Sequence, residues 1–221
     1  MICLRNVRKS YPTRSGPVVI LRDLTTDILA GKRLGILGRN GAGKSTLIRL
    51  ISGAELPTSG YVDRSMSVSW PLAFGGAFQN ALTGLDNLRF ICRVYNVTVD
   101  DKIEYVQEFS ELGRYLREPV STYSAGMRAR LAFAISMVVE FDCFLVDEII
   151  AVGDSRFHHK CNIELFEKRS DRAMVFVSHD DGYIREYCHY ACVLIDGRLV
   201  NFPTVEEALE FYAFSQKVAD F

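Results

Sequence analysis

The segment Gly38-Arg39-Asn40-Gly41-Ala42-Gly43-Lys44-Ser45 decides the fold of this 221-residue chain. It matches the pattern G-x-x-x-x-G-K-[ST] in full, between a strand predicted at Arg33–Leu37 and a helix predicted at Lys44–Ser52. Glycines allow successive backbone N–H groups to turn inward around phosphate oxygens, and the helix N-terminus adds its positive dipole end. We expect Lys44 to reach the β- and γ-phosphates of a nucleoside triphosphate and Ser45 to ligate Mg²⁺. The residues predicted to hold the phosphates are Gly38, Arg39, Asn40, Gly41, Ala42, Gly43, Lys44, Ser45 and Thr46.

An acidic pair follows a second apolar run, Cys143–Val146. A buried strand that ends in Asp147 presents a carboxylate at its C-terminal edge, where open α/β sheets bind ligands. We expect Asp147 to hold Mg²⁺ through water and Glu148 to act as general base on the attacking water. An Asp-Glu pair after a strand is usually a solvated turn, but the phosphate loop favours the functional interpretation.

Two further features are ambiguous on their residues alone. His179 follows an apolar run at Met174–Val177, and a lone histidine in that position is more often structural than catalytic. Tyr123-Ser124-Ala125-Gly126-Met127 opens an apolar helix, and small residues at a helix start suggest an anion site. Taken alone, Ser124 is better interpreted as an ordinary N-cap.

The alternation of predicted elements indicates an α/β fold. Ile2–Val7 predicts a first strand and Pro12–Pro17 a loop, and residues from about 85 to 139 have a mostly helical pattern. A mostly parallel sheet with a helical insertion explains this order. We therefore predict one domain, 1–221, with a core at 1–79 and 138–221 and a helical subdomain at about 80–137. The later predicted elements are strands at Cys143–Val146, Met174–Val177 and Ala191–Ile195 and a last helix that begins at Thr204, which has capping-box spacing with Glu207.

The composition is that of an ordinary globular protein, with 48% apolar and 24% charged residues and a formal net charge of −1. This balance provides no overall field for nucleic acid, and no stretch approaches the ~20 apolar residues that span a bilayer. The N-terminus lacks the pattern of a secretory signal, so we expect a cytosolic chain. The six cysteines fit reduced, structural thiols better than a metal site at Cys188-x-x-x-Cys192.

The chain resembles the nucleotide-binding subunit of ABC transporters over essentially its whole length. The resemblance implies an ABC-type P-loop NTPase core, with an antiparallel N-terminal β portion and an inserted helical subdomain. The elements that carry it, in order, are Tyr11, the loop 38–46, Gln79, the signature Tyr123–Met127, Asp147-Glu148, the stretch Ala151-Val152-Gly153-Asp154, and His179.

The family assigns roles to these residues. Tyr11 would stack on the adenine, and Gln79 would join Ser45 around Mg²⁺ and sense the γ-phosphate. His179 would contact that phosphate and position Glu148. Ser124 and Gly126 would contact ATP held by a second copy of the chain, which implies a dimer that sandwiches two ATP molecules.

Two stretches depart from the family pattern. The usual signature is L-S-G-G-Q, and here Tyr123, Ala125 and Met127 replace Leu, Gly and Gln. Met127 has no side-chain hydrogen-bond donor, which puts the contact expected of Gln in doubt. The stretch after Glu148 usually reads P-T-S-A-L-D, and of it Asp154 is retained.

These departures, with Ser69-Trp70-Pro71-Leu72 and Leu82-Thr83-Gly84, resemble the ATPases of bacterial capsular polysaccharide exporters. The resemblance implies a peripheral ATPase at the cytoplasmic face of the inner membrane, with a separate permease subunit as partner. O-antigen or teichoic acid export is the nearest alternative. An ATPase acting on nucleic acid or the ribosome, a small-molecule kinase and a non-hydrolysing regulatory module are other classes, and the whole set of motifs favours none of them.

The segment from about Asn80 to Thr122 is predicted to meet the membrane partner. It lies between Gln79 and Ser124, so both of its ends would respond to nucleotide. Leu82 and Leu85 are candidate contacts in a groove for a short helix of the partner. The alternative is that these leucines only pack the lobe.

Overall fold

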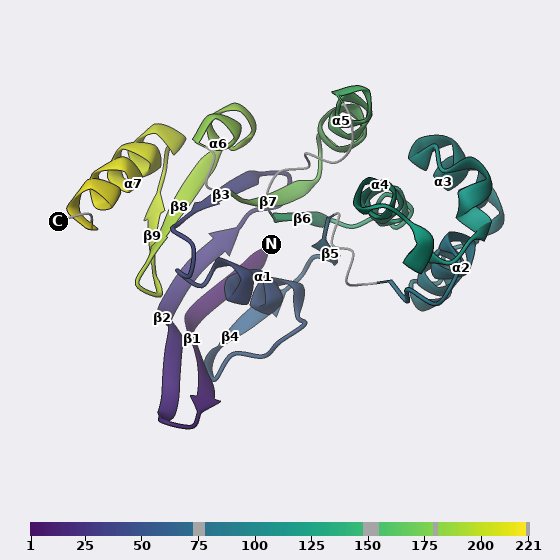
Figure 1. Ribbon diagram of the computed structural model, residues 1–221. Coiled ribbons are helices and arrows are strands. Elements are labelled where there is room, and N and C mark those ends of the chain that lie inside the picture. Colours follow the sequence, from purple (N-terminus) through teal and green to yellow (C-terminus); the bar gives the residue numbers. More distant parts are fainter. Residues whose placement is uncertain (73–77, 148–154, 179–180, 220–221) are drawn as a thin grey trace. The chain divides into compact units, whose positions relative to one another are not determined.

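The computed structural model describes residues 1–72, 78–147, 155–178 and 181–219 (Figure 1). The chain divides into two compact units. The first unit contains 1–71, 141–148 and 171–221, and the second contains 72–140 and 149–170.

An antiparallel sheet of three strands in the order β2-β1-β4 begins the first unit. The strands are β1 (Ile2–Thr13), β2 (Gly16–Ile28) and β4 (Ser59–Arg64). The predicted loop at Pro12–Pro17 is wrong in its extent, because Pro12 pairs with Pro17 and Thr13 with Gly16 in a hairpin. The Thr13 hydroxyl donates to the Gly16 carbonyl at 2.6 Å and closes a turn of only two residues.

The central sheet has six strands in the order β5-β6-β7-β3-β8-β9. Pairing is parallel except between β8 and β9, so the predicted mostly parallel sheet is confirmed. The inner strands are continuous apolar runs because helices cover both faces of such a sheet. The strands are β3 (Arg33–Leu37), β5 (Val68–Pro71), β6 (Cys143–Asp147), β7 (Ala173–Val177), β8 (Tyr190–Ile195) and β9 (Arg198–Phe202).

Helices cover the central sheet from both sides (Figure 1). Helix α1 (Lys44–Ser52) contacts β5 and β6 and also β2, so it lies between the two sheets of this unit. Helices α6 (Asp181–Tyr187) and α7 (Val205–Ala219) cover the opposite face, where α7 contacts β3, β8 and β9. The predicted cap of α7 is confirmed, since Thr204 Oγ1 accepts from the Glu207 N–H at 3.3 Å.

The second unit is helical. It contains α2 (Gly84–Val94), α3 (Asp100–Ser110), short 3₁₀ turns η2 (Gly113–Arg117) and η3 (Val120–Thr122), α4 (Ala125–Ser136), α5 (Ser155–Asn162) and a π-helical turn η4 (Ile163–Glu167).

The placement of α5 and η4 in this unit differs from the predicted division, which assigned everything after 138 to the core. Phe157 of α5 is fully buried and lies edge-on to Phe109, with ring centroids 5.4 Å apart. Phe109 in turn stacks on Phe133 at 5.6 Å. This aromatic cluster joins three helices that are distant in sequence, which explains the wider helical unit.

No helix in the described part of the chain is long and apolar enough to cross a membrane. All six cysteines are free thiols. Cys192 donates to Asn201 Oδ1 at 3.0 Å, and His189 Nδ1 accepts from the Arg33 N–H, also at 3.0 Å. These side chains therefore have structural hydrogen-bond partners.

Candidate functional site

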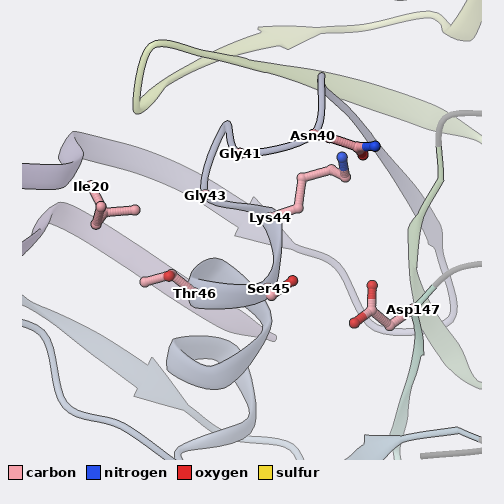
Figure 2. A pocket seen from close by; sticks show the side chains of 8 residues that line it. All are labelled: Ile20, Asn40, Gly41, Gly43, Lys44, Ser45, Thr46 and Asp147. Carbon is pink, nitrogen blue, oxygen red and sulfur yellow. The ribbon is translucent and has the colours of Figure 1, made fainter.

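A pocket of about 520 Å³ lies at the carboxyl ends of β3 and β6 (Figure 2). The loop after β3 and the first turn of α1 form one wall, and the end of β6 contributes Asp147. The lining residues are Ile20, Asn40, Gly41, Gly43, Lys44, Ser45, Thr46 and Asp147.

Two glycines permit the shape of the loop. Gly41 and Gly43 have φ angles of +84° and +107°, in the left-handed region that side chains disfavour. A Cβ at Gly43 would also lie 2.8 Å from Leu21 Cδ2. Gly43 is the N-cap of α1, supplies no side-chain cap, and leaves the first N–H groups of the helix available to an anion.

Lys44 is only 7% exposed, although its side chain is charged. Its Nζ donates to the carbonyl oxygens of Gly38 at 2.6 Å and Arg39 at 3.1 Å. These bonds hold the ammonium against the main chain of the loop, and Lys44 lines the pocket. The first turn of α1 contains no acidic residue, so its positive end is not neutralised from within the helix.

Ser45 and Asp147 face each other across the pocket (Figure 2). A hydroxyl and a carboxylate are hard oxygen ligands of the kind that Mg²⁺ prefers, so this donor set fits the ion. The strand that ends in Asp147 is not a direct neighbour of the strand that precedes the loop. β7 lies between β6 and β3, and the two residues line one pocket because parallel strands end at the same edge.

A polar network extends from the pocket toward Tyr11. Arg49 donates to the pocket residue Thr46 at 3.3 Å and to the Tyr11 hydroxyl at 3.2 Å, and Tyr11 donates to Glu55 at 2.6 Å. The bond from Tyr11, with those from Lys9 and Arg49, lowers the pKa of Glu55 to about 2. Lys9 also lies 5.0 Å from the centre of the Tyr11 ring. The ring is therefore fixed at its hydroxyl end, beside the pocket but not among its lining residues.

In the second unit, Ser124 caps α4 by accepting from the Met127 N–H at 3.2 Å, which confirms the N-cap. Ser124, Gly126 and Met127 line a separate hollow of about 370 Å³ together with Arg130 and Glu111. Tyr123 is instead 3% exposed, and its hydroxyl donates to the Tyr115 carbonyl at 2.5 Å. The side chain that replaces the usual leucine is thus a core residue, while the small residues remain exposed.

The side chain of Gln79 is exposed, and its main chain is hydrogen-bonded to the side chain of Asn87. The sequence motifs do not include four further residues of these sites, namely Asn87, Arg49, Glu55 and Ile20. An asparagine in the first turn of a predicted amphipathic helix is the sequence feature that could have drawn attention to Asn87. Glu148, His179 and the stretch Ala151–Asp154 lie outside the described residues.

Comparison with known proteins gives the same interpretation. Residues 21–151 match the ABC transporter family model. The chain is 58% identical to the capsule polysaccharide export ATP-binding protein CtrD of Neisseria meningitidis, over 96% of this chain and 98% of that protein. It is 57% identical to the ATP-binding protein BexA of Haemophilus influenzae, over 98% of this chain and all of that protein.

The chain belongs to the ABC transporter family. The predicted family and its ATPase class are confirmed by these matches. Among solved structures, the dimeric ATP-binding cassette MJ0796 bound to ADP and Pi has a TM-score of 0.79 at 21% identity, over 93% of this chain and 99% of that one. That likeness confirms the predicted ABC-type α/β fold.

Proposed function

We propose that this ABC ATPase binds and hydrolyses Mg-ATP to drive export of a capsular polysaccharide through a separate membrane subunit. One observation carries the proposal: the phosphate loop, Ser45 and Asp147 line one pocket in a chain that matches CtrD and BexA nearly end to end. CtrD is named as a capsule polysaccharide export protein, which supports the same class of cargo here.

Different described residues would bind the phosphates, the Mg²⁺ ion and the adenine. The N–H groups at the start of α1 and the Lys44 ammonium would hold the β- and γ-phosphates, with Lys44 exchanging its bonds to the loop carbonyls for phosphate oxygens. Ser45 and Asp147 would hold Mg²⁺, which when bound neutralises charge that develops on the phosphates. Tyr11, held by Arg49 and Glu55, would offer a ring face to the adenine.

Residues outside the described segments complete the chemistry. We propose Glu148 as the general base and His179 as the residue that orients it toward water. We also propose that Gln79, a described residue, joins Ser45 around Mg²⁺ and senses the γ-phosphate.

A dimer fits the exposed signature residues. Ser124 and Gly126 lie at the N-terminus of α4, where they could meet the γ-phosphate held by a second copy. The MJ0796 cassette is described as a dimer, which supports the same arrangement here.

The partner in the membrane is proposed to contact the outer side of α2. Leu82, Phe90 and Val94 are 39%, 52% and 57% exposed, and the last two lie one helical turn apart. Leu85 is only 6% exposed and packs within the helical unit, so the predicted contact between Leu85 and the partner is wrong. Such contacts would hold the ATPase at the cytoplasmic face of the inner membrane.

Steady-state Mg-ATPase activity of the purified chain tests the site. Lys44→Ala should abolish turnover, because it removes the side-chain cation aimed at the phosphates. Lys32→Ala, an exposed lysine just before β3, is the matched control and should leave turnover unchanged. Near-normal activity of Lys44→Ala would refute the assignment of the phosphate loop.

Glu148→Gln should retain ATP binding but lose hydrolysis by about 10²–10⁴-fold, as is typical for loss of a general base. Unhydrolysed ATP should then hold two copies together, as measured by light scattering with and without Mg-ATP. A variant that stays monomeric with ATP demonstrably bound would contradict the dimer.

Export itself is tested by complementation. A Neisseria meningitidis strain that lacks CtrD should regain surface capsule when this chain is expressed, and Leu82→Asp should fail to restore it while keeping soluble ATPase activity. Capsule restored equally by Leu82→Asp, Phe90→Asp and Val94→Asp would place the coupling contact elsewhere.

A further inference from the structure

Asn87 lies in the first turns of α2 and is 1% exposed. Its side-chain oxygen accepts from the Gln79 N–H at 3.0 Å. Its side-chain nitrogen donates to the carbonyl oxygens of Gln79 at 3.2 Å and Thr83 at 2.9 Å. Both main-chain polar groups of Gln79 are thus bound to one side chain eight residues away.

This arrangement fixes the orientation of the amide. Reversing it would set the NH₂ group against the Gln79 N–H and the oxygen against two carbonyls, so one orientation satisfies all three bonds. A buried amide left without these partners would be destabilising, so the native contact strongly favours this one orientation.

The segment that Asn87 holds is also fixed from its other side. The Ser121 N–H donates to the Asn80 carbonyl at 2.8 Å, and the Val120 N–H donates to the Leu82 carbonyl at 2.9 Å. Thr83 caps α2 by accepting from the Asp86 N–H at 3.0 Å. The main chain at 79–83 is therefore held in one place, whereas the Gln79 side chain stays exposed.

We propose that Asn87 is the positioning residue for Gln79. Asn87 ties the main chain of Gln79 to α2, and this fixes the position from which the Gln79 side chain projects. The inference rests on the proposed function, because it needs Gln79 to act in the Mg-ATP site. It assigns to Asn87 no contact with nucleotide.

The test is a double-mutant cycle on Mg-ATPase activity with Asn87→Ala, Gln79→Ala and the double variant. Removing an outer-shell partner of a metal ligand typically costs 10–100-fold in metal affinity or activity. We expect Asn87→Ala to lower kcat about 10–100-fold and to raise the Mg²⁺ concentration needed for half-maximal rate. ATP binding measured without Mg²⁺ should not change, since the phosphate loop is intact.

The decisive measurement is the effect of Asn87→Ala on kcat in a chain that already contains Gln79→Ala. If Asn87 acts through Gln79, adding Asn87→Ala there should lower kcat by less than about 2-fold. An equal 10–100-fold loss in both backgrounds would overturn the proposal. Cys92→Ala, a buried change on the same helix, controls for loosened packing and should leave the Mg²⁺ dependence as in wild type.

If Asn87→Ala does not fold, Asn87→Asp replaces it in the same double-mutant cycle. The aspartate keeps an oxygen that can accept from the Gln79 N–H and removes the two N–H donors of the amide. A wild-type chain without Mg-ATPase activity would instead refute the proposed function. Wild-type kinetics and Mg²⁺ dependence in Asn87→Asp would refute the positioning role alone.

Discussion

Replacing Arg169 by Met tests the attachment of the segment 155–169 to the helical unit. Arg169 is 7% exposed and donates to the Glu164 carboxylate at 2.7 Å, the Met137 carbonyl at 3.0 Å and the Glu140 carboxylate at 2.9 Å. Glu164 is itself only 5% exposed. The change keeps most of the side-chain volume and removes the charge and every donor.

The cost follows from what is left behind. Breaking a buried ion pair costs about 3–5 kcal/mol, because one charge stays buried without its partner. Glu164 retains Lys168 at 2.8 Å, and Glu140 is 59% exposed and can be solvated. We therefore expect the lower end, about 3 kcal/mol, which corresponds to a fall in Tm of roughly 6–12 °C for a chain of this size.

Calorimetry gives Tm, and amide hydrogen exchange shows where the loss occurs. Exchange should accelerate in α5 and η4 and hardly change in β3. Arg89→Met is the matched control, because Arg89 pairs with Asp86 at 3.2 Å with both side chains about half exposed, and it should cost under about 1 kcal/mol. Arg169→Met combined with Glu164→Leu should be less harmful than Arg169→Met alone. A fall in Tm no larger for Arg169→Met than for Arg89→Met would refute the reasoning.

Three more outcomes are expected. Gly41→Ala and Gly43→Ala should both weaken ATP binding in equilibrium titrations, Gly43→Ala more, because its Cβ adds a 2.8 Å contact to the strain of a positive φ that both share. The free energy of unfolding of the wild type should exceed that of a Glu55→Gln variant by a constant amount above about pH 5. Because its pKa falls from 4.5 unfolded to about 2 folded, this advantage should shrink as pH drops through that window in urea titrations. Burial raises the pKa of Cys143 and Cys192 to about 12, so mass spectrometry after iodoacetamide treatment at pH 8 should find them alkylated only in the unfolded chain.

The phosphate loop could be predicted closely because its determinants are local. The strand Arg33–Leu37 and the helix Lys44–Ser52 have the predicted bounds. An apolar run, left-handed glycines and a helix start each act within a few residues, so their order in the sequence is enough. Asp147 could be predicted for the same reason, since an apolar run that ends in an acidic residue is a local sequence pattern.

Other parts of the site depend on contacts between distant residues. Tyr11 reaches Glu55 across 44 positions, and nothing in either local sequence indicates that pair. Helix α5 belongs to the helical unit, and not to the core as predicted, because the cluster of Phe109, Phe133 and Phe157 joins three segments that are distant in sequence. Each of these phenylalanines alone predicts only a buried position.

The hydrogen bonds around 79–83 link Gln79 to the start of α4 within the second unit. If Gln79 senses nucleotide as proposed, these bonds would let the second unit respond as one body. Gln79 is bound to Asn87 on α2, and Asn80 is bound to Ser121, three residues before Ser124. Tyr123, next to Ser124, is packed so closely on the start of α2 that a Cβ at Gly84 would lie 2.7 Å from its hydroxyl. Since buried interfaces of this kind resist gradual deformation, a displacement imposed at Gln79 should be carried to Ser124 rather than absorbed between them. The Asn87 variants would cut this connection at its first bond, and for that reason they should alter the Mg²⁺ dependence of hydrolysis before they alter ATP binding.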